Sequence, residues 1–420
     1  MITKDYTKSN FVWNAVGNIT YMMCQWLITV LVPILGGFGD AGILSVAMSV
    51  SATCQTIGMF GIRNFQVSDV EGKYHNSCYV GLRAITCGAA MVACLVFSLV
   101  SGYHFNQVIA ILLFMTFRLA ETYSDVLHGI AQKNGRLYIG GISFFIKGVG
   151  LLVSFLVAFL LSKNNLNAGL LAMTAFSCAT VVLYDLPQVR KIADFRLTDS
   201  LGRCGRLALE TLPLCIYLFL YSAIFTLPKL ILGDVSGESI LGAYSSIYAP
   251  AMLLQAASTY LYTPFATNFG DLRQKGDKKA FRSLLLKIVI AILIMSAVVL
   301  VMALLLGEFA LVLVFGEKIR PYAGYLLPIL LVNIGCAYFG FFCMLSIVLR
   351  AFRWLLSGCF VGFFLSVLLT KPAIRMFDVN GTSYSVVFAT VVASIVLLIG
   401  IMISFSKMKP NGEFCPSIEM

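Results

Sequence analysis

Apolar runs of about 20 residues recur along the whole chain, and short polar stretches separate them. A run of that length, wound as an α-helix, spans the hydrocarbon core of a bilayer. The pattern therefore predicts an all-α, polytopic integral membrane protein. We expect about twelve transmembrane helices, at 11–35, 41–62, 79–101, 107–129, 139–161, 166–184, 208–232, 240–262, 284–306, 321–349, 354–376 and 383–405.

The fourth predicted helix carries charges in the middle of its apolar run. Arg118, Glu121, Asp125 and His128 follow one another at spacings of three, four and three residues, which places them on one helix face. Charged side chains at membrane depth are costly, and they persist where they line a water-filled path or pair inside a bundle. The stripe favours a protein that moves something polar across the bilayer.

A second intramembrane cation, Lys147 in the fifth predicted helix, should reach the depth of Glu121. One interpretation is a cationic and protonatable wall, in which Arg118 and Lys147 attract an anionic head group. Glu121 and Asp125 would then pair with these cations or carry a coupling proton. The alternative is an internal salt-bridge cluster that only fixes helix packing.

Polar residues also gather near the predicted helix ends. Arg63 and Asp69 close the second helix in the stretch GIRNFQVSD, where they are candidates to bind phosphate or to form a gate contact with Arg136. Glu210 precedes Pro213 early in the seventh helix, so a bend there is a candidate gate. Ordinary flanking charge and a purely structural kink are the alternatives.

Two further helices carry amide and aromatic stripes. Asn14 and Asn18 lie one turn apart in the first helix, and Tyr244, Tyr248 and Gln255 recur at similar spacings in the eighth. Amides and aromatic rings suit a cavity that handles sugars, because amides bond to hydroxyls and rings stack on apolar sugar faces. Interhelical hydrogen bonding and interfacial anchoring are the alternatives.

Charge sets the expected topology. Only 12% of the residues are charged, the mean hydropathy is +0.90 and the formal net charge is +11. Lys and Arg concentrate in alternate connections, which by the positive-inside rule places both termini in the cytoplasm. The net charge is thus mostly topology and does not indicate a nucleic-acid partner. The longest connection predicts an N-terminal six-helix lobe (1–184), a basic cytoplasmic linker (185–207) and a C-terminal six-helix lobe (208–420).

The sequence offers no pattern for catalysis or metal binding. The twelve Cys lack metal-binding spacing, and the three His are scattered. Neither a Walker A loop nor a serine nucleophile elbow is present. We therefore expect a transporter rather than an enzyme, without a cofactor. Its energy would come from an ion gradient, the membrane potential or the substrate gradient.

Several stretches together resemble a known family of transporters. They are Trp13-Asn14 with Gly17, Arg63-x-x-Gln66-x-Ser68-Asp69, Arg118-x-x-Glu121-x-x-x-Asp125-x-x-x-Gly129-x-x-Gln132, Arg136-Leu137-Tyr138, Lys147, Tyr184-Asp185, Pro228-Lys229 and Gly242-x-Tyr244 to Pro250. In these stretches the chain resembles lipid-linked oligosaccharide flippases, the O-antigen and capsule repeat-unit translocases. They form the polysaccharide transporter family of the multidrug/oligosaccharidyl-lipid/polysaccharide (MOP) exporter superfamily. The likeness covers about residues 10–270.

This resemblance implies two six-helix lobes around a V-shaped central cavity, in a bacterial cytoplasmic membrane. The implied substrate is an undecaprenyl-diphosphate-linked oligosaccharide, moved to the outer leaflet by alternating access and coupled to H⁺, Na⁺ or the membrane potential. Besides the lipid bilayer, a polysaccharide polymerase and glycosyltransferases are the implied candidate partners.

Two other functions compete with a flippase. A multidrug or metabolite antiporter of the MATE kind would have the same architecture, but a cationic cavity disfavours its often cationic substrates. A membrane-embedded glycan polymerase or ligase would need a sizeable outer loop with catalytic residues. The longest expected outer loop, about 307–320, is short.

Overall fold

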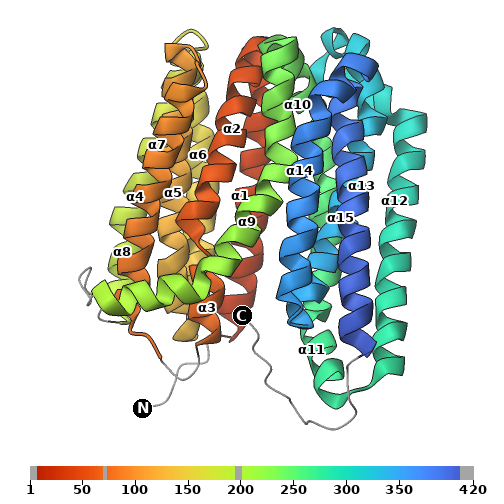
Figure 1. Ribbon diagram of the computed structural model, residues 1–420. Helices are drawn as coiled ribbons and strands as arrows, with labels where there is room; N and C mark the ends of the chain where they lie inside the picture. Colours follow the sequence, from red (N-terminus) through yellow and green to blue (C-terminus); the bar gives the residue numbers. More distant parts are fainter. Residues whose placement is uncertain (1–6, 70–72, 194–200, 407–420) are drawn as a thin grey trace. The chain divides into compact units, whose positions relative to one another are not determined.

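The computed structural model describes residues 7–69, 73–193 and 201–406, and it is shown in Figure 1. Within these ranges all regular secondary structure is helical, and twelve helices are long and apolar enough to cross a membrane. Each predicted span overlaps one of them. The predicted all-α fold with about twelve transmembrane helices is confirmed, and the chain is a multi-pass membrane protein.

The helices vary more in length than the hydropathy pattern predicts, because several continue well past the hydrocarbon core. Short π-helical or 3₁₀ stretches extend others: η1 (Val181–Asp185), η2 (Thr263–Phe265) and η3 (Glu317–Tyr325). The α-helices are α1 (Thr7–Leu35), α2 (Gly37–Met59), α3 (Ile62–Ser68), α4 (Asn76–Val100), α5 (Phe105–Lys133), α6 (Tyr138–Leu161), α7 (Leu166–Thr180), α8 (Leu186–Arg190), α9 (Leu201–Ser236), α10 (Glu238–Tyr262), α11 (Ala266–Lys275), α12 (Lys278–Phe315), α13 (Leu326–Val348), α14 (Phe352–Phe377) and α15 (Asn380–Ser406).

By the contacts among its helices, the chain forms two compact units, Met1–Ser246 and Ile247–Met420. In the first unit, α1 packs along α6, α2 along α5, and α9 along α2. The unit boundary falls within α10. The expected division at 185–207, of which 194–200 lie outside the described residues, and the V-shaped cavity stay predictions.

Glycine lets α1 and α6 cross at very short range. A Cβ added at Gly17 would lie 1.9 Å from the carbonyl oxygen of Gly141, and one added at Gly141 would lie 2.3 Å from that of Trp13. Small residues at such a crossing let two backbones approach, which favours dispersion contacts between membrane helices. The crossing fixes α6, and with it Lys147, relative to the rest of the first unit.

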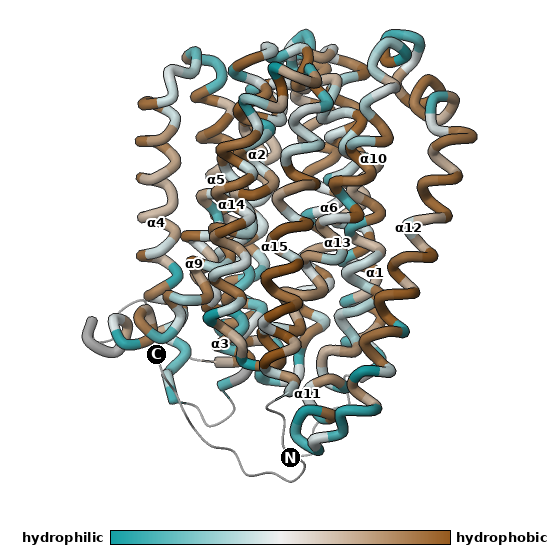
Figure 2. The backbone as a smooth tube through the Cα atoms, turned by 45° about the vertical axis from the view of Figure 1, so that its right-hand side comes forward, coloured by the Kyte–Doolittle hydropathy of each residue, from teal (hydrophilic) through white to brown (hydrophobic). Residues whose placement is uncertain are grey.

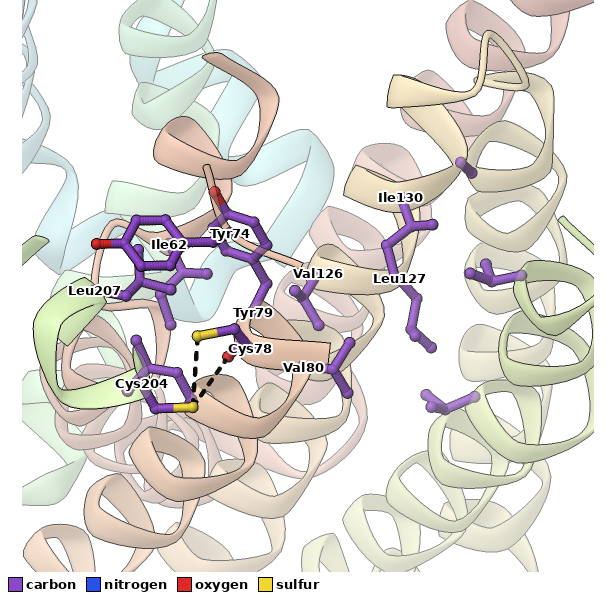
Figure 3. Packing of buried hydrophobic residues seen from close by; sticks show 14 of the residues in the cluster. Ile62, Tyr74, Cys78, Tyr79, Val80, Val126, Leu127, Ile130, Cys204 and Leu207 are labelled. Carbon is purple, nitrogen blue, oxygen red and sulfur yellow. Dashed lines mark hydrogen bonds between the residues drawn. The ribbon is translucent and has the colours of Figure 1, made fainter. Parts of the chain in front are cut away.

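An apolar cluster holds the end of the first unit at which α3 lies. Figure 3 shows Cys204 and Leu207 of α9 beside Cys78 and Tyr79 of α4, with Ile62 of α3 next to them. The Sγ atoms of Cys78 and Cys204 are 3.5 Å apart, so they are free thiols in contact. The first turns of α9 therefore pack across α3 and α4 as part of the core.

In the second unit, α14 packs along α15, and α13 packs against α15. An aromatic cluster closes one end, where the ring of Phe281 lies 4.9 Å from that of Phe269 and 5.5 Å from that of Phe405. Figure 2 shows hydrophilic residues on α11 and at its junction with α12, and hydrophobic residues along most of α12. This contrast marks the place where α12 enters its apolar stretch.

Candidate functional site

A break between α2 and α3 positions the first candidate cation, Arg63. The sequence predicts one helix as far as residue 62, but α2 ends at Met59 because Phe60 (φ 48°) and Gly61 (φ 67°) are left-handed. That backbone region is open to glycine and uncommon for a bulky residue. The chain restarts as α3, which packs on α5 and brings Arg63 to Asp125.

Arg63, Arg83 and Asp125 form a triad on α3, α4 and α5. Arg63 Nη1 lies 3.0 Å from Asp125 Oδ1, and Arg83 Nη2 lies 3.1 Å from Asp125 Oδ2. Arg63 also donates to the Asp125 carbonyl oxygen, and its Nη2 donates to Gln132 Oε1 at 2.7 Å. The side chains of Arg63 and Asp125 are 23% and 31% exposed, whereas that of Arg83 is 0% exposed.

Arg83 was not assigned to the site from the sequence, although it falls within the predicted helix at 79–101. The structure places it within α4, fully buried. Its Nη1 donates to the carbonyl oxygens of Gly58 at 2.9 Å and Met59 at 2.7 Å, the last residues of α2. A cation stabilises the negative, C-terminal end of a helix dipole. Arg83 therefore stabilises both the end of α2 and the Asp125 carboxylate.

A second charge pair lies on the side of α5 that faces α1. Arg118 Nη1 lies 2.9 Å from Glu121 Oε2, and Glu121 Oε1 accepts a hydrogen bond of 2.9 Å from Gln25 Nε2. The Arg118 guanidinium also lies over the rings of Phe114 and Phe117, at 5.3 and 5.6 Å from their centroids. The expected partnership of Glu121 with a cation of the stripe is thus present.

The third cluster is fully buried and gathers Lys147, His128 and Ser124 around Asp185. Asp185 Oδ2 accepts from Lys147 Nζ at 2.8 Å and from the Ser124 hydroxyl at 2.7 Å. His128 Nε2 lies 3.2 Å from Asp185 Oδ1, and Lys147 also donates to Ser124. Lys147 is thus paired with a buried carboxylate, and its part in a cationic wall with Arg118 stays a prediction.

A fourth cluster surrounds Asp69 at the junction of α3 and α4. Its carboxylate accepts from the backbone N–H of Lys73 at 2.8 Å, the N–H of Tyr74 at 3.2 Å and the Tyr79 hydroxyl at 2.9 Å. Burial alone raises the pKa of Asp69, but these hydrogen bonds and the nearby Lys133 ammonium hold it below its usual value. Asp69 therefore orders this junction as an ionised carboxylate.

Glu210 joins the same junction to α9. It accepts from Lys73 Nζ at 2.6 Å and from the Tyr74 hydroxyl at 3.0 Å. α9 continues through Pro213, and Figure 1 shows that this helix changes direction along its length. Glu210 thus lies at the contact between the bent helix and the α3–α4 junction, and its gating role stays a prediction.

The amide and aromatic candidates are found in two settings. Asn18 Nδ2 donates to the carbonyl oxygen and the side-chain Oδ1 of Asn14, at 2.7 and 3.0 Å, and both side chains are partly exposed. Tyr244 and Tyr248 are buried in α10, and Gln255 is half-buried. Their sugar-binding role remains a prediction. Arg136 lies in the turn between α5 and α6, where its backbone N–H donates to the Ala131 carbonyl oxygen at 2.9 Å.

Asp185 is a further residue that we did not assign to the site. It lies at the end of the π-helical turn η1, which widens the helix and is a common feature of functional positions. The Tyr184-Asp185 pair in the family resemblance was the available signal. Among the described residues, no group of three or more His, Cys, Asp or Glu side chains is placed to hold a metal ion.

Charge balance distinguishes the clusters. The Arg118–Glu121 and Lys147–Asp185 pairs each match one cation with one carboxylate. The Arg63–Asp125–Arg83 triad matches two guanidinium groups with one carboxylate and is therefore net positive. Since Arg63 is partly exposed, this excess charge is accessible to a ligand, and a guanidinium fork suits phosphate oxygens.

Comparison with solved structures identifies the fold. The lipid II flippase MurJ in an inward closed conformation matches with a TM-score of 0.68 at 10% identity, over 94% of this chain and 90% of that one. The MATE multidrug transporter DinF-BH matches with a TM-score of 0.64 at 14% identity, over 94% and 95%. A mutant of the MATE transporter VcmN from Vibrio cholerae matches at 0.59 and 12%, over 95% and 97%. The chain has the fold of MOP superfamily transporters.

Comparison by sequence finds a relative among proteins of known name. The "Capsular polysaccharide biosynthesis protein CapF" of Staphylococcus aureus is 26% identical over 315 residues, which are 74% of this chain and 77% of that protein. No model of a protein family matches the chain.

Proposed function

We propose that the protein is a flippase that moves an undecaprenyl-diphosphate-linked oligosaccharide from the cytoplasmic to the outer leaflet for surface polysaccharide biosynthesis. The observation that carries the proposal is the Arg63–Asp125–Arg83 triad, whose positive charge exceeds its negative charge. A lipid-linked diphosphate is an anion that such a site can hold, since arginine binds phosphate oxygens through two parallel donors.

Arg63 is the residue of the triad that would contact the diphosphate. Its side chain is partly exposed, whereas Arg83 is buried and fixed by the α2 carbonyl oxygens. Asp125 lowers the excess positive charge of the triad, so the ligand is bound weakly enough to be released. A transporter requires this release on the far side of the membrane. Arg118, whose charge is matched by Glu121, is the candidate second contact for the substrate along α5.

The sugar part of the substrate would meet amide and aromatic side chains. Asn14 and Asn18 expose amide groups on α1, and Gln25 and Tyr21 continue the same helix toward Glu121. These groups hydrogen-bond to one another, and such bonds exchange readily with hydroxyls of a ligand. That adaptability fits a transporter that must hold the substrate and then release it.

The comparisons support this substrate class in two ways. The fold is shared with the lipid II flippase MurJ. The relative from Staphylococcus aureus carries a name that places it in capsular polysaccharide biosynthesis without stating its step. An ion or potential gradient would drive alternating access, with Glu121 and Asp125 as the candidate sites for a coupling H⁺ or Na⁺.

The alternative function is a MATE-like antiporter, which the shared fold of the MATE transporters favours. Purified protein in liposomes separates the two. One preparation carries a fluorescent undecaprenyl-diphosphate oligosaccharide, whose arrival in the opposite leaflet is read by an impermeant quencher. The other is loaded with a cationic dye.

The flippase proposal expects lipid movement that Arg63→Gln reduces and the exposed control Arg282→Gln does not. Dye efflux under an ion gradient, without movement of the lipid-linked sugar, would establish the antiporter instead.

A further inference from the structure

A basic groove lies between α11 and α12 in the second unit, and no residue assigned above lines it. It is a pocket of about 410 Å³. Figure 2 shows the hydrophilic residues that gather on α11 and at the start of α12. The groove is lined by Asn268, Asp271, Lys275, Ser283, Leu284 and Lys287, among others.

The walls of the groove are held in place from behind. Phe269 on α11 and Phe281 on α12 are buried and pack ring to ring, 4.9 Å between centroids. The turn between the helices uses Gly276 at φ 68° and Asp277, whose Oδ1 accepts from the Ala280 N–H at 2.9 Å. Because both ends of the turn are held in place, Lys275 and Lys287 line the same groove.

The groove lies where α12 enters the apolar part of the bilayer. Lys287 is followed by the uncharged run 288–307, which at about 1.5 Å per residue is as long as the hydrocarbon core is thick. Lys287 therefore lies at the level of lipid head groups. The groove is thus at the depth where a lipid phosphate is found.

An apolar stripe rises from the groove along the same face of α12. Ile294, Val298 and Val301 follow Ser283 and Lys287 at helical spacing, and all three are exposed. A lipid whose phosphate lies between the two lysines would have its acyl chains directly against this stripe. Head-group recognition and chain packing therefore point to one ligand.

We propose that this groove is a binding site for an anionic phospholipid, with the phosphate between Lys275 and Lys287 and with Ser283 and Asn268 as hydrogen-bond partners. Two lysines and one carboxylate, Asp271, give the lining a single net positive charge, which matches a phosphate diester. The Asp271 carboxylate accepts a hydrogen bond from a hydroxylated head group such as glycerol. A basic pocket beside a membrane helix is a known mode of lipid recognition.

Native mass spectrometry of the full-length protein tests the site without reference to transport. The protein is purified in detergent with equal amounts of phosphatidylglycerol and phosphatidylcholine, and the lipids retained are counted. Wild type is expected to retain phosphatidylglycerol preferentially. Lys275→Gln/Lys287→Gln should reduce that preference by about 30-fold, since each basic residue near a membrane surface contributes a factor of about five and the two factors multiply.

The matched control is Lys279→Gln/Arg282→Gln, which removes two exposed cations of α12 that do not line the groove. This control should keep the wild-type preference. Equal loss in both double variants, or unchanged retention in Lys275→Gln/Lys287→Gln, would overturn the proposal. Displacement of the lipid by excess inorganic phosphate would also overturn it, because the site would then recognise phosphate alone.

Discussion

Arg83 and Asp125 form an ion pair in which Arg83 is fully buried and Asp125 is partly exposed. Arg83 Nη2 lies 3.1 Å from Asp125 Oδ2, yet Arg83 is 0% exposed and Asp125 is 31% exposed. The second oxygen of the same carboxylate binds Arg63 at 3.0 Å. Asp125 is therefore the link between a structural arginine and one that can meet a ligand, and the two arginines should respond differently to mutation.

Removal of Asp125 should destabilise the protein as well as impair transport. Asp125→Ala leaves the buried Arg83 guanidinium without its carboxylate, and breaking a buried pair in this way costs about 3 kcal/mol or more. Thermal unfolding in detergent, followed by size-exclusion chromatography, measures the change. Asp125→Glu is the control, since it keeps the charge. An unchanged melting temperature in Asp125→Ala would mean that the pair does not support the fold.

Arg63→Gln should have the opposite profile. Arg63 is partly exposed, and its loss leaves Arg83 still paired with Asp125, so we expect a melting temperature close to that of wild type. Transport of the lipid-linked oligosaccharide should fall at least about tenfold, because a charge-assisted bond of about 1.5–3 kcal/mol is lost. Arg63→Lys should recover it only in part, since lysine lacks the planar fork. Wild-type transport by Arg63→Gln at equal abundance would contradict the role.

The buried Lys147–Asp185 pair predicts non-additive mutants. Asp185→Leu isolates a buried ammonium and should destabilise by about 3–5 kcal/mol, whereas Lys147→Met/Asp185→Leu removes both charges and should cost much less. A double-mutant cycle on unfolding free energies gives the coupling. Additive effects of the two single changes would show that the side chains do not depend on each other.

Asp69 predicts a pH dependence of stability. Its hydrogen bonds and Lys133 hold its pKa below the usual value, so the stabilisation is complete above the unfolded pKa of about 3.9 and is lost as the pH falls through the folded one. The difference in melting temperature between wild type and Asp69→Asn should be constant above about pH 5 and shrink below about pH 4. A difference that grows on acidification would contradict this sign.

The fourth-helix stripe shows how far sequence reasoning reached. Spacing placed Arg118, Glu121, Asp125 and His128 on one face, but such a face is broad enough to meet several neighbours. In the structure these side chains meet different partners. Glu121 contacts Gln25 of α1, Asp125 contacts α3 and α4, and His128 contacts Asp185. Helical periodicity predicts the direction in which a side chain leaves the helix axis. The partner that the side chain meets depends on tertiary packing.

The two unforeseen charges had different causes. Arg83 lies close to a predicted helix start, where hydropathy cannot distinguish a flanking cation from one drawn into the core by a partner. Asp185 stands at the end of the sixth predicted span, where an acidic residue is ordinary. Asp185 becomes a candidate site residue only through its ion pair with Lys147, which is distant in sequence. The helix count, in contrast, followed directly from the length of the apolar runs.

The most direct test of the central claim is deletion of the gene in its own host, with analysis of surface glycan and of undecaprenyl-diphosphate oligosaccharide on the cytoplasmic side. We predict loss of the glycan and accumulation of the intermediate, restored by wild type and not by Arg63→Gln. Unchanged glycan without accumulated intermediate, in a strain with no paralogue to replace the protein, would contradict the flippase proposal.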